Sequence, residues 1–164
     1  MTPRAAILAL PLLLSLSAAA QLPRNEASVS AGWTEFADLG GARAAGASYA
    51  RYWNIAIATE VGGIFAEGRH DFTDLHATVQ LHVLRERRVS PWIGFGAARL
   101  WIDDPERPRS KFTPTGGAGI DVAITPRLAL GGEFRYAPFE IDPRDRFGLS
   151  VNPTTFSLAA RWRF

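Results

Sequence analysis

The sequence predicts an all-β fold, an eight-stranded antiparallel up-and-down barrel that crosses a membrane with its strands. Three observations predict it. After residue 20, apolar residues alternate with a period of two and do not follow a helical spacing. Short and long connections between the alternating runs follow each other in strict alternation. A short apolar segment at the N-terminus has the features of an export signal.

The N-terminal segment carries Arg4, then an apolar stretch interrupted by Pro11, and it ends in three alanines at 18–20. A positive charge, an apolar region and an Ala-x-Ala site in this order are typical of a cleaved secretory signal. The stretch is short for a helix that must cross a hydrocarbon core of about 30 Å. We therefore expect residues 1–20 to be a signal peptide and residues 21–164 to form one barrel domain.

The composition excludes several kinds of site. The chain has no cysteine, so it has neither disulfides nor thiolate metal ligands. Its formal net charge of +2 is too small to indicate a nucleic-acid partner. We therefore expect no cofactor, no metal site and no nucleic-acid partner, and a domain held together by packing and hydrogen bonds.

Eight runs of alternating residues follow the signal segment. Each has about 9–13 residues, longer than the roughly 5–6 of a typical globular strand and close to the ~9–11 that a tilted membrane-crossing strand needs. The runs are residues 26–37, 45–53, 55–66, 73–85, 91–102, 112–124, 127–137 and 153–164.

The connections fall into two classes. Those after the second, fourth and sixth runs are tight (Asn54, ERRVS and TP), whereas those after the other runs are longer and rich in Gly, Pro and charge. Short turns at one end and long loops at the other are typical of outer-membrane barrels. An even number of strands returns both termini to the short-turn end, which is periplasmic for an exported chain. The pattern therefore predicts periplasmic termini and four longer surface loops.

Alternation gives each run one apolar face and one face of small and polar residues. In the run 73–85, Val79 lies on the apolar face, and His76, Gln80 and His82 lie on the other. Eight apolar faces would overfill an eight-strand interior, so we expect them to face lipid and the polar residues to face the lumen. Aromatic residues near the run ends are expected to form girdles at the two headgroup levels. They are Trp33, Trp53, Phe65, Trp92, Trp101 and Tyr136.

Two stretches, PWIGFGAA and TGGAGIDVAITPRLALGGEFRYAP, occur together with the signal segment, the eight runs and the terminal Phe164. This combination resembles the small bacterial outer-membrane β-barrel family, which includes the OmpA transmembrane domain and OmpX-like proteins. The resemblance implies contact with outer-membrane lipid and lipopolysaccharide. It also implies that Trp162 and Phe164 form a C-terminal signal for the barrel assembly machinery. Periplasmic chaperones are expected to carry the unfolded chain to that machinery. We expect a monomer.

Ionisable residues on the inward faces predict an ion-pair network. Three acids are matched by three arginines, and buried charges need partners, whereas an ion-selective pore more often has a surplus of one sign. The residues of the expected network are Glu60, Arg99, Asp121, Glu133, Arg135 and Arg161. The inward faces of runs 45–53 and 91–102 stay open, because Arg51 and Arg99 lie among aromatic residues.

Several functions fit these patterns. We expect a non-catalytic structural protein that presents loops at the surface; the alternatives are a narrow gated pore and a soluble, lipocalin-like binder of apolar ligands. Some eight-stranded outer-membrane barrels are lipid A deacylases, and theirs is the most similar activity. Their catalytic His and Ser lie close together on one strand and face lipid, whereas His76 and His82 are on the luminal face and no His-x-Ser pair exists.

Overall fold

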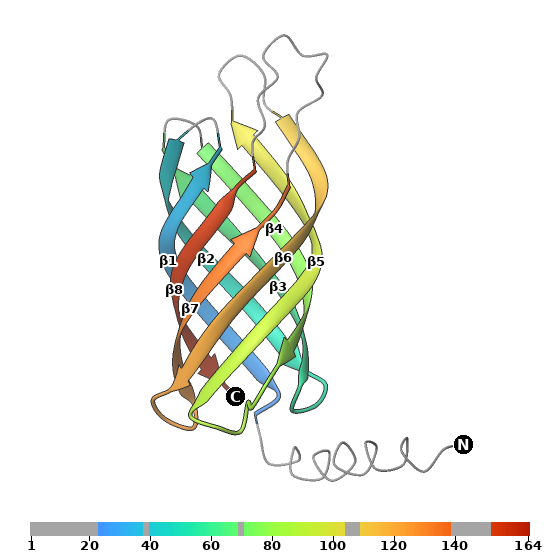
Figure 1. The fold of residues 1–164 in the computed structure, drawn as a ribbon, viewed down its shortest axis with the longest axis vertical. Helices are drawn as coiled ribbons and strands as arrows, with labels where there is room; N and C mark the ends of the chain where they lie inside the picture. The colour runs from blue at the N-terminus through green and yellow to red at the C-terminus, as the bar shows by residue number, and fades with distance from the viewer. Residues whose placement is uncertain (1–22, 38–39, 69–70, 104–108, 139–151) are drawn as a thin grey trace, which may run out of the picture.

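The computed structural model describes residues 23–37, 40–68, 71–103, 109–138 and 152–164. In these residues, eight antiparallel strands form a closed barrel in which each strand pairs with its neighbours in the chain and the last strand closes on the first (Figure 1). The predicted fold is confirmed. The strands are β1 (Asn25–Phe36), β2 (Gly40–Tyr52), β3 (Ile57–Glu67), β4 (Asp71–His82), β5 (Val89–Asp103), β6 (Arg109–Ala123), β7 (Leu128–Tyr136) and β8 (Thr154–Arg163).

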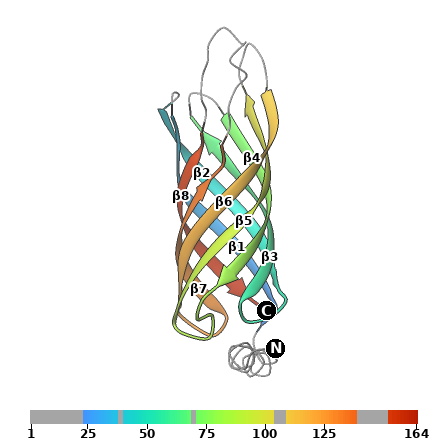
Figure 2. The ribbon, with the colours of Figure 1, turned by 45° about the vertical axis from the view of Figure 1, so that its right-hand side comes forward.

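The two ends of the barrel differ. The turns 53–56, 83–88 and 124–127 lie at the end where β1 begins and β8 stops, which we call the terminal end. At the opposite end, which we call the loop end, β1, β3, β5 and β7 stop and β2, β4, β6 and β8 begin (Figures 1 and 2). At the terminal end Asn25 and Phe164 exchange two backbone hydrogen bonds of 3.0 and 2.9 Å. These bonds extend the β1–β8 ladder to the edge of the barrel.

Side-chain acceptors shape two of the tight turns. The Asn54 Oδ1 atom accepts hydrogen bonds from the backbone N–H groups of Ala56 and Ile57, at 2.8 and 2.7 Å. The Thr125 Oγ1 atom similarly accepts from the N–H groups of Arg127 and Leu128. Asn and Thr favour turns because their side chains can replace a backbone acceptor.

The structure corrects the predicted loop lengths. β2 begins at Gly40 and β4 at Asp71, so the connections after the first and third strands are short, and the prediction of four long loops is wrong. The segment after Phe36 is rich in Gly and Ala, but Ala42 and Ala44 alternate into the barrel interior and are buried. Their small side chains fit inside the barrel. Backbone pairing with the neighbouring strands therefore extends β2 where the composition suggested a loop.

Apolar side chains cover the outside of the barrel. Leu158 is 76% exposed and Val79 is 55% exposed, whereas Gln80, the next residue after Val79, is 1% exposed. This alternation confirms the expected faces of β4, with the apolar side outward. In the described part of the chain, no helix has the length and hydropathy needed to cross a membrane.

Two glycines are required where strands approach closely. A Cβ atom on Gly32 of β1 would collide with the carbonyl oxygen of Phe156 on β8, and one on Gly96 of β5 would collide with that of Ala77 on β4. Any larger residue at either position would push the neighbouring strands apart. Gly32 is therefore needed for the β1–β8 contact that closes the barrel.

Candidate functional site

The centre of the lumen is organised around Arg161 on β8, which is 2% exposed. Its Nε atom donates to Asp121 Oδ1 at 2.8 Å, and its Nη2 atom donates to Glu133 Oε2 at 2.5 Å. The Nη1 atom lies 3.8 Å from Glu26 and 4.0 Å from Glu60. One guanidinium thus joins carboxylates from four strands, which is the partnering that a buried charge requires.

Glu60 on β3 forms the second centre of the network. Its Oε1 atom accepts a 2.8 Å hydrogen bond from Arg135 Nη2 and lies 3.5 Å from His76 Nε2. The other ring nitrogen of His76, Nδ1, lies 2.9 Å from Asp74 Oδ1. Ser48 donates to the remaining Glu60 oxygen at 3.0 Å. The histidine is therefore held between two carboxylates in the lumen.

At the terminal end, Glu26 accepts a hydrogen bond from Arg163 at 2.9 Å and one from the Tyr52 hydroxyl at 3.4 Å. Arg85, from the turn after β4, lies over the Tyr52 ring with its Cζ atom 3.2 Å from the ring centroid. Arg85 Nη2 also donates to the Pro23 carbonyl oxygen at 2.7 Å. Burial lowers the pKa of the Arg85 guanidinium from its ordinary value. These contacts fill the terminal mouth of the barrel.

Large apolar side chains gather at the loop end of the lumen. Phe36 and Phe72 meet edge to face with their centroids 5.3 Å apart. Leu100, with an exposed fraction of 0%, packs with them, and Ile64 and Ile102 belong to the same buried cluster. We call Phe36, Ile64, Phe72, Leu100 and Ile102 the loop-end plug. The sequence predictions did not include it, although the alternation of Leu100 and Ile102 in β5 was a signal for it.

Two site residues lie on a different face of the barrel from the one predicted. Arg99 is exposed on the outer face, and Leu100 points inward in its place; the prediction that Arg99 belongs to the network is wrong. Trp92 was expected in a girdle but is 3% exposed, inside the barrel, where the ring stacks on His82 at 6.2 Å. Both errors have one cause: β5 has aromatic residues on both faces, so its inward face could not be read from alternation.

The other predicted luminal residues lie inside the barrel. Glu60, Asp121, Arg135, Arg161, His76, Gln80 and His82 are buried, and Glu133 contacts Arg161. The predicted network left out Glu26, Asp74, Arg85 and Arg163, which the structure also brings into the lumen. They lie near strand ends or in a turn, where alternation over a few residues gives little information. No group of three or more His, Cys, Asp or Glu residues that could hold a metal ion occurs within the described ranges.

The outer surface carries two belts of aromatic residues. Trp53, Trp162 and Phe164 are exposed at the terminal end, with exposed fractions of 63%, 50% and 54%. Trp33 and Phe65 are exposed toward the loop end, together with Tyr136 and the half-exposed Trp101. Aromatic rings with a polar edge favour the headgroup levels of a bilayer. The apolar wall lies between the two belts, as in a membrane-spanning barrel.

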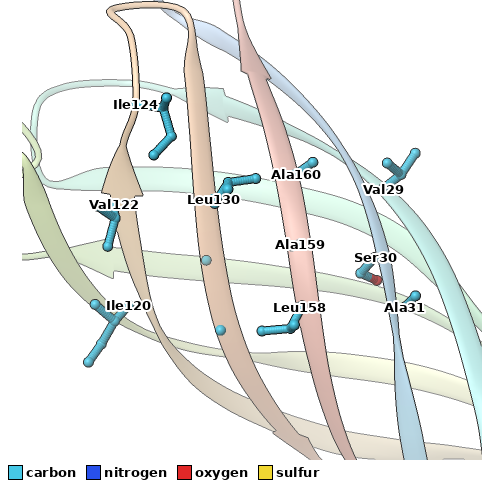
Figure 3. Close-up of a pocket in the computed structure, with 12 residues that line it drawn as sticks. Val29, Ser30, Ala31, Ile120, Val122, Ile124, Leu130, Leu158, Ala159 and Ala160 are labelled. Atoms are coloured by element: carbon cyan, nitrogen blue, oxygen red, sulfur yellow. The ribbon is translucent and has the colours of Figure 1, made fainter.

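The outer wall also has a shallow apolar groove of about 770 Å³ across β6, β7, β8 and β1 (Figure 3). Ile120, Leu130, Leu158 and Val29 line it, and Gly132 leaves space in it. The groove is part of the apolar wall between the aromatic belts. It is therefore a feature of the lipid-facing surface, separate from the polar lumen.

A closed barrel with an apolar outer wall, aromatic belts and a charged interior defines a membrane-spanning β-barrel. The chain belongs to the family described as the outer membrane protein beta-barrel domain, whose family model matches residues 6–164. This family places the chain in the bacterial outer membrane, in contact with its lipid.

Solved structures of outer-membrane barrels share the fold. Neisserial surface protein A (NspA) has a TM-score of 0.65 and 16% identity, over 85% of this chain and 96% of that one. The N-terminal β-barrel domain of Pseudomonas aeruginosa OprF has a TM-score of 0.64 and 12% identity, over 87% and 99%. Ail of Yersinia pestis, in complex with the heparin analogue sucrose octasulfate, has a TM-score of 0.56 and 20% identity, over 86% and 99%. No curated protein sequence matches this chain.

Proposed function

We propose that this protein is a non-catalytic, monomeric outer-membrane scaffold whose lumen is sealed and whose loop end presents surface connections outside the cell. The observation that carries the proposal is the two-part filling of the lumen. The loop-end plug is apolar and packed, and below it Arg161 joins the carboxylates of Asp121 and Glu133. An ion entering from the loop end would meet first the apolar side chains of the plug and then fixed, mutually compensated charges.

The absence of a catalytic role is supported by the surroundings of the histidines. His76 contacts Asp74 and Glu60, and His82 contacts Tyr52 and Gln80. Neither of these two rings contacts a serine hydroxyl in the described part of the chain. His76 and His82 both face the lumen, where a membrane lipid cannot reach them.

A narrow gated pore is the second candidate. Seven buried side-chain polar atoms have no hydrogen-bond partner in the described part of the chain: His76 Nε2, Gln80 Nε2, His82 Nδ1, Arg85 Nε, Trp92 Nε1, Asp121 Oδ2 and Arg135 Nε. Groups of this kind are usually satisfied by internal water. Water in the terminal half of the lumen would leave the loop-end plug as the single barrier to ions. The soluble-binder alternative requires an apolar interior and a polar exterior, and this barrel has the reverse arrangement.

Current measurements in planar bilayers separate scaffold from pore. The unmodified protein is expected to carry little or no current. Replacing two plug residues together, Phe72→Ala with Leu100→Ala, should open the constriction and raise conductance. The same pair of changes on the outer wall, Phe95→Ala with Leu158→Ala, is the control and should not. Stable unitary currents from the unmodified barrel would show that the lumen is a pore.

We further propose that residues 1–20 are a signal peptide, that residues 21–164 form the mature domain, and that the terminal end is periplasmic. The chain has no native cysteine, so single cysteines report topology cleanly. Glu67→Cys lies at the loop end and Glu86→Cys in a terminal-end turn. A membrane-impermeant maleimide added to intact cells should label the first variant and should label the second only after the outer membrane is opened. The reverse pattern would invert the proposed orientation.

A further inference from the structure

A four-residue pattern occurs twice on the outer wall of the barrel. Residues 50–53 read ARYW and residues 98–101 read ARLW. Arg51 and Arg99 are both exposed, and each guanidinium lies over the ring of the tryptophan two residues later. The Cζ-to-centroid distances are 5.3 Å for Arg51 and Trp53, and 5.0 Å for Arg99 and Trp101.

The two Arg–Trp pairs lie at opposite ends of the membrane-spanning wall. Arg51 is the penultimate residue of β2, at the terminal end. Through Thr59 and Val79 it is in register with Phe95 of β5, and Arg99 lies four residues beyond Phe95 toward the loop end. Four residues along a strand tilted by about 40°, together with the stagger across three strand spacings, separate the two arginines by roughly 20 Å along the barrel axis. An outward apolar band is ~25 Å tall, so each pair lies near one boundary between hydrocarbon and headgroups.

Neither arginine faces an acid on a neighbouring strand. The Cα partners of Arg51 are Asn25 and Thr59, and those of Arg99 are Leu75 and Phe112. Among the described residues, each guanidinium has the ring contact as its one interaction. A ring holds one face of a guanidinium and leaves its N–H donors free in the plane. Two oriented sets of donors at headgroup depth thus lack an acceptor among the described residues.

We propose that the Arg51–Trp53 and Arg99–Trp101 pairs bind the phosphate groups of membrane lipids, one pair in each leaflet, and so fix the depth of the barrel in the bilayer. Arginine suits this ligand because its planar fork of donors matches phosphate oxygens in a bidentate, charge-assisted geometry. Each tryptophan limits the freedom of the arginine and anchors it at the interface. The assignment of each pair to a leaflet rests on the proposed orientation of the barrel. The proposal that the pairs bind phosphate does not depend on that orientation.

The test compares stability in two kinds of vesicle with the same acyl chains, one of phosphatidylglycerol and one of a phosphate-free galactosyl diacylglycerol. Arg51→Gln and Arg99→Gln should each lower the folding equilibrium constant about five-fold in the phosphate vesicles, the effect of one basic residue near an anionic surface. Neither should lower it in the galactolipid. Arg43→Gln is the matched control, because exposed Arg43 on β2 lies opposite Glu67; it should have no lipid-dependent effect.

Equal losses in both lipids, no loss in either, a loss for one pair alone, or a lipid-dependent loss in Arg43→Gln would each overturn the proposal. If inorganic phosphate added to galactolipid vesicles reproduces the stabilisation, the ligand is free phosphate and the assignment to lipid is wrong. Dipolar recoupling NMR between arginine ¹³Cζ and lipid ³¹P supplies a measurement on the unmodified protein. It should detect guanidinium–phosphate contacts that Arg51→Gln and Arg99→Gln each reduce, and the absence of contacts would also overturn the proposal.

Discussion

At the scale of single residues, the lumen depends on a few charged side chains that have more than one partner. Arg161 contacts Asp121 and Glu133 directly and lies within 4.0 Å of Glu60. Such a residue differs from a surface ion pair, because its loss leaves several buried carboxylates uncompensated.

Arg161→Met is therefore expected to destabilise the barrel strongly. Removing one partner from a buried ion pair costs about 3–5 kcal/mol, and Asp121 and Glu133 would both lose their shortest contact. Urea unfolding in lipid vesicles measures the change. Arg127→Met, an exposed residue in a terminal-end turn, is the control and should stay within about 0.5 kcal/mol of the unmodified protein. Similar losses for the two variants would contradict a central role for Arg161.

Trp92 shows how an aromatic ring can occupy a narrow lumen. The ring fits because Gly119 on β6 carries no side chain: a Cβ atom there would lie 2.7 Å from the indole. Gly132, on the next strand, faces outward, and a Cβ atom there would meet nothing within 4 Å.

These two glycines give a matched pair of substitutions. Gly119→Ala should destabilise the barrel by about 1–3 kcal/mol, the usual cost of overpacking. Gly132→Ala should be neutral, because its methyl group enters the lipid-facing groove. Both changes add one methyl group, so unfolding titrations compare packing alone. A loss at Gly132 as large as that at Gly119 would mean that backbone conformation, and not contact with Trp92, sets the cost.

At the scale of the strand, each element has a lipid face and a lumen face, and the lipid face also has depth. On β4, Val79 lies near the middle of the wall, and Val83 follows the end of the strand at the terminal end; their exposed fractions are similar, 55% and 51%. Their exposed fractions do not distinguish the two residues, but their depth in the bilayer does.

Val79→Arg should cost about 2–4 kcal/mol, because an arginine at the bilayer midplane must be hydrated or moved to the interface. Val83→Arg should cost at most about 1 kcal/mol, since the same side chain near a headgroup reaches water at once. Refolding titrations into vesicles measure both. Equal costs would place the wall outside the hydrocarbon.

β8 joins the end of the barrel to its beginning, and the family resemblance implies that the C-terminal residues Trp162 and Phe164 form an assembly signal. Trp162 and Phe164 face outward, while the backbone of Phe164 pairs with Asn25. The aromatic side chains are thus free for a partner during assembly and exposed to lipid afterwards.

We expect Phe164→Asp to reduce the amount of barrel in the outer membrane several-fold, whereas Phe164→Tyr should be tolerated because it keeps the ring. The measurement is the outer-membrane yield in cells, normalised to synthesis. Asp103→Ala, a charge change at the loop end, is the control. Equal yields for Phe164→Asp and the control would argue against a recognition role.

At the scale of the whole molecule, closure of the sheet pairs the backbone groups that would otherwise lie at open edges in hydrocarbon. The β1–β8 ladder runs in register from Glu26↔Arg163 to Glu35↔Thr154. Because Gly32 permits this contact, closure of the barrel depends on this glycine as well as on the alternation of apolar and polar side chains along the strands.

The folded barrel should therefore resist detergent and migrate at a different apparent mass before and after boiling. Gly32→Val should weaken closure and reduce the fraction of the unboiled, folded band. Gly40→Val, at the loop-end start of β2, where a Cβ atom would meet nothing within 4 Å but φ is +80°, is a control for local strain without contact. A full folded band for Gly32→Val would show that the strands can shift to accept the side chain.

The sequence predicted the number of strands, their order and most of their inward faces, because period-two alternation is a local property of the chain. Val79 and Gln80 illustrate this, since each face of β4 is uniform over many residues. For β5 this prediction failed. Trp92 and Leu100 are apolar but lie on the inward face, and the charged Arg99 lies on the outward face, so polarity did not indicate which face of β5 points inward. The strand starts at Gly40 and Asp71 were missed for a related reason, because Gly, Ala and charged residues also suit loops.

By itself, the sequence determined the class of fold and the lipid-facing side of the strands, since both follow from hydrophobicity repeated along the chain. The tertiary structure decided which charges meet. Glu26 and Arg163 are near opposite ends of the barrel sequence, and only closure of β8 on β1 brings them to 2.9 Å. It also decided that Phe36, Phe72 and Leu100 meet in one plug. Contacts between distant residues depend on register and strand tilt, which are set by the packing of all eight strands together.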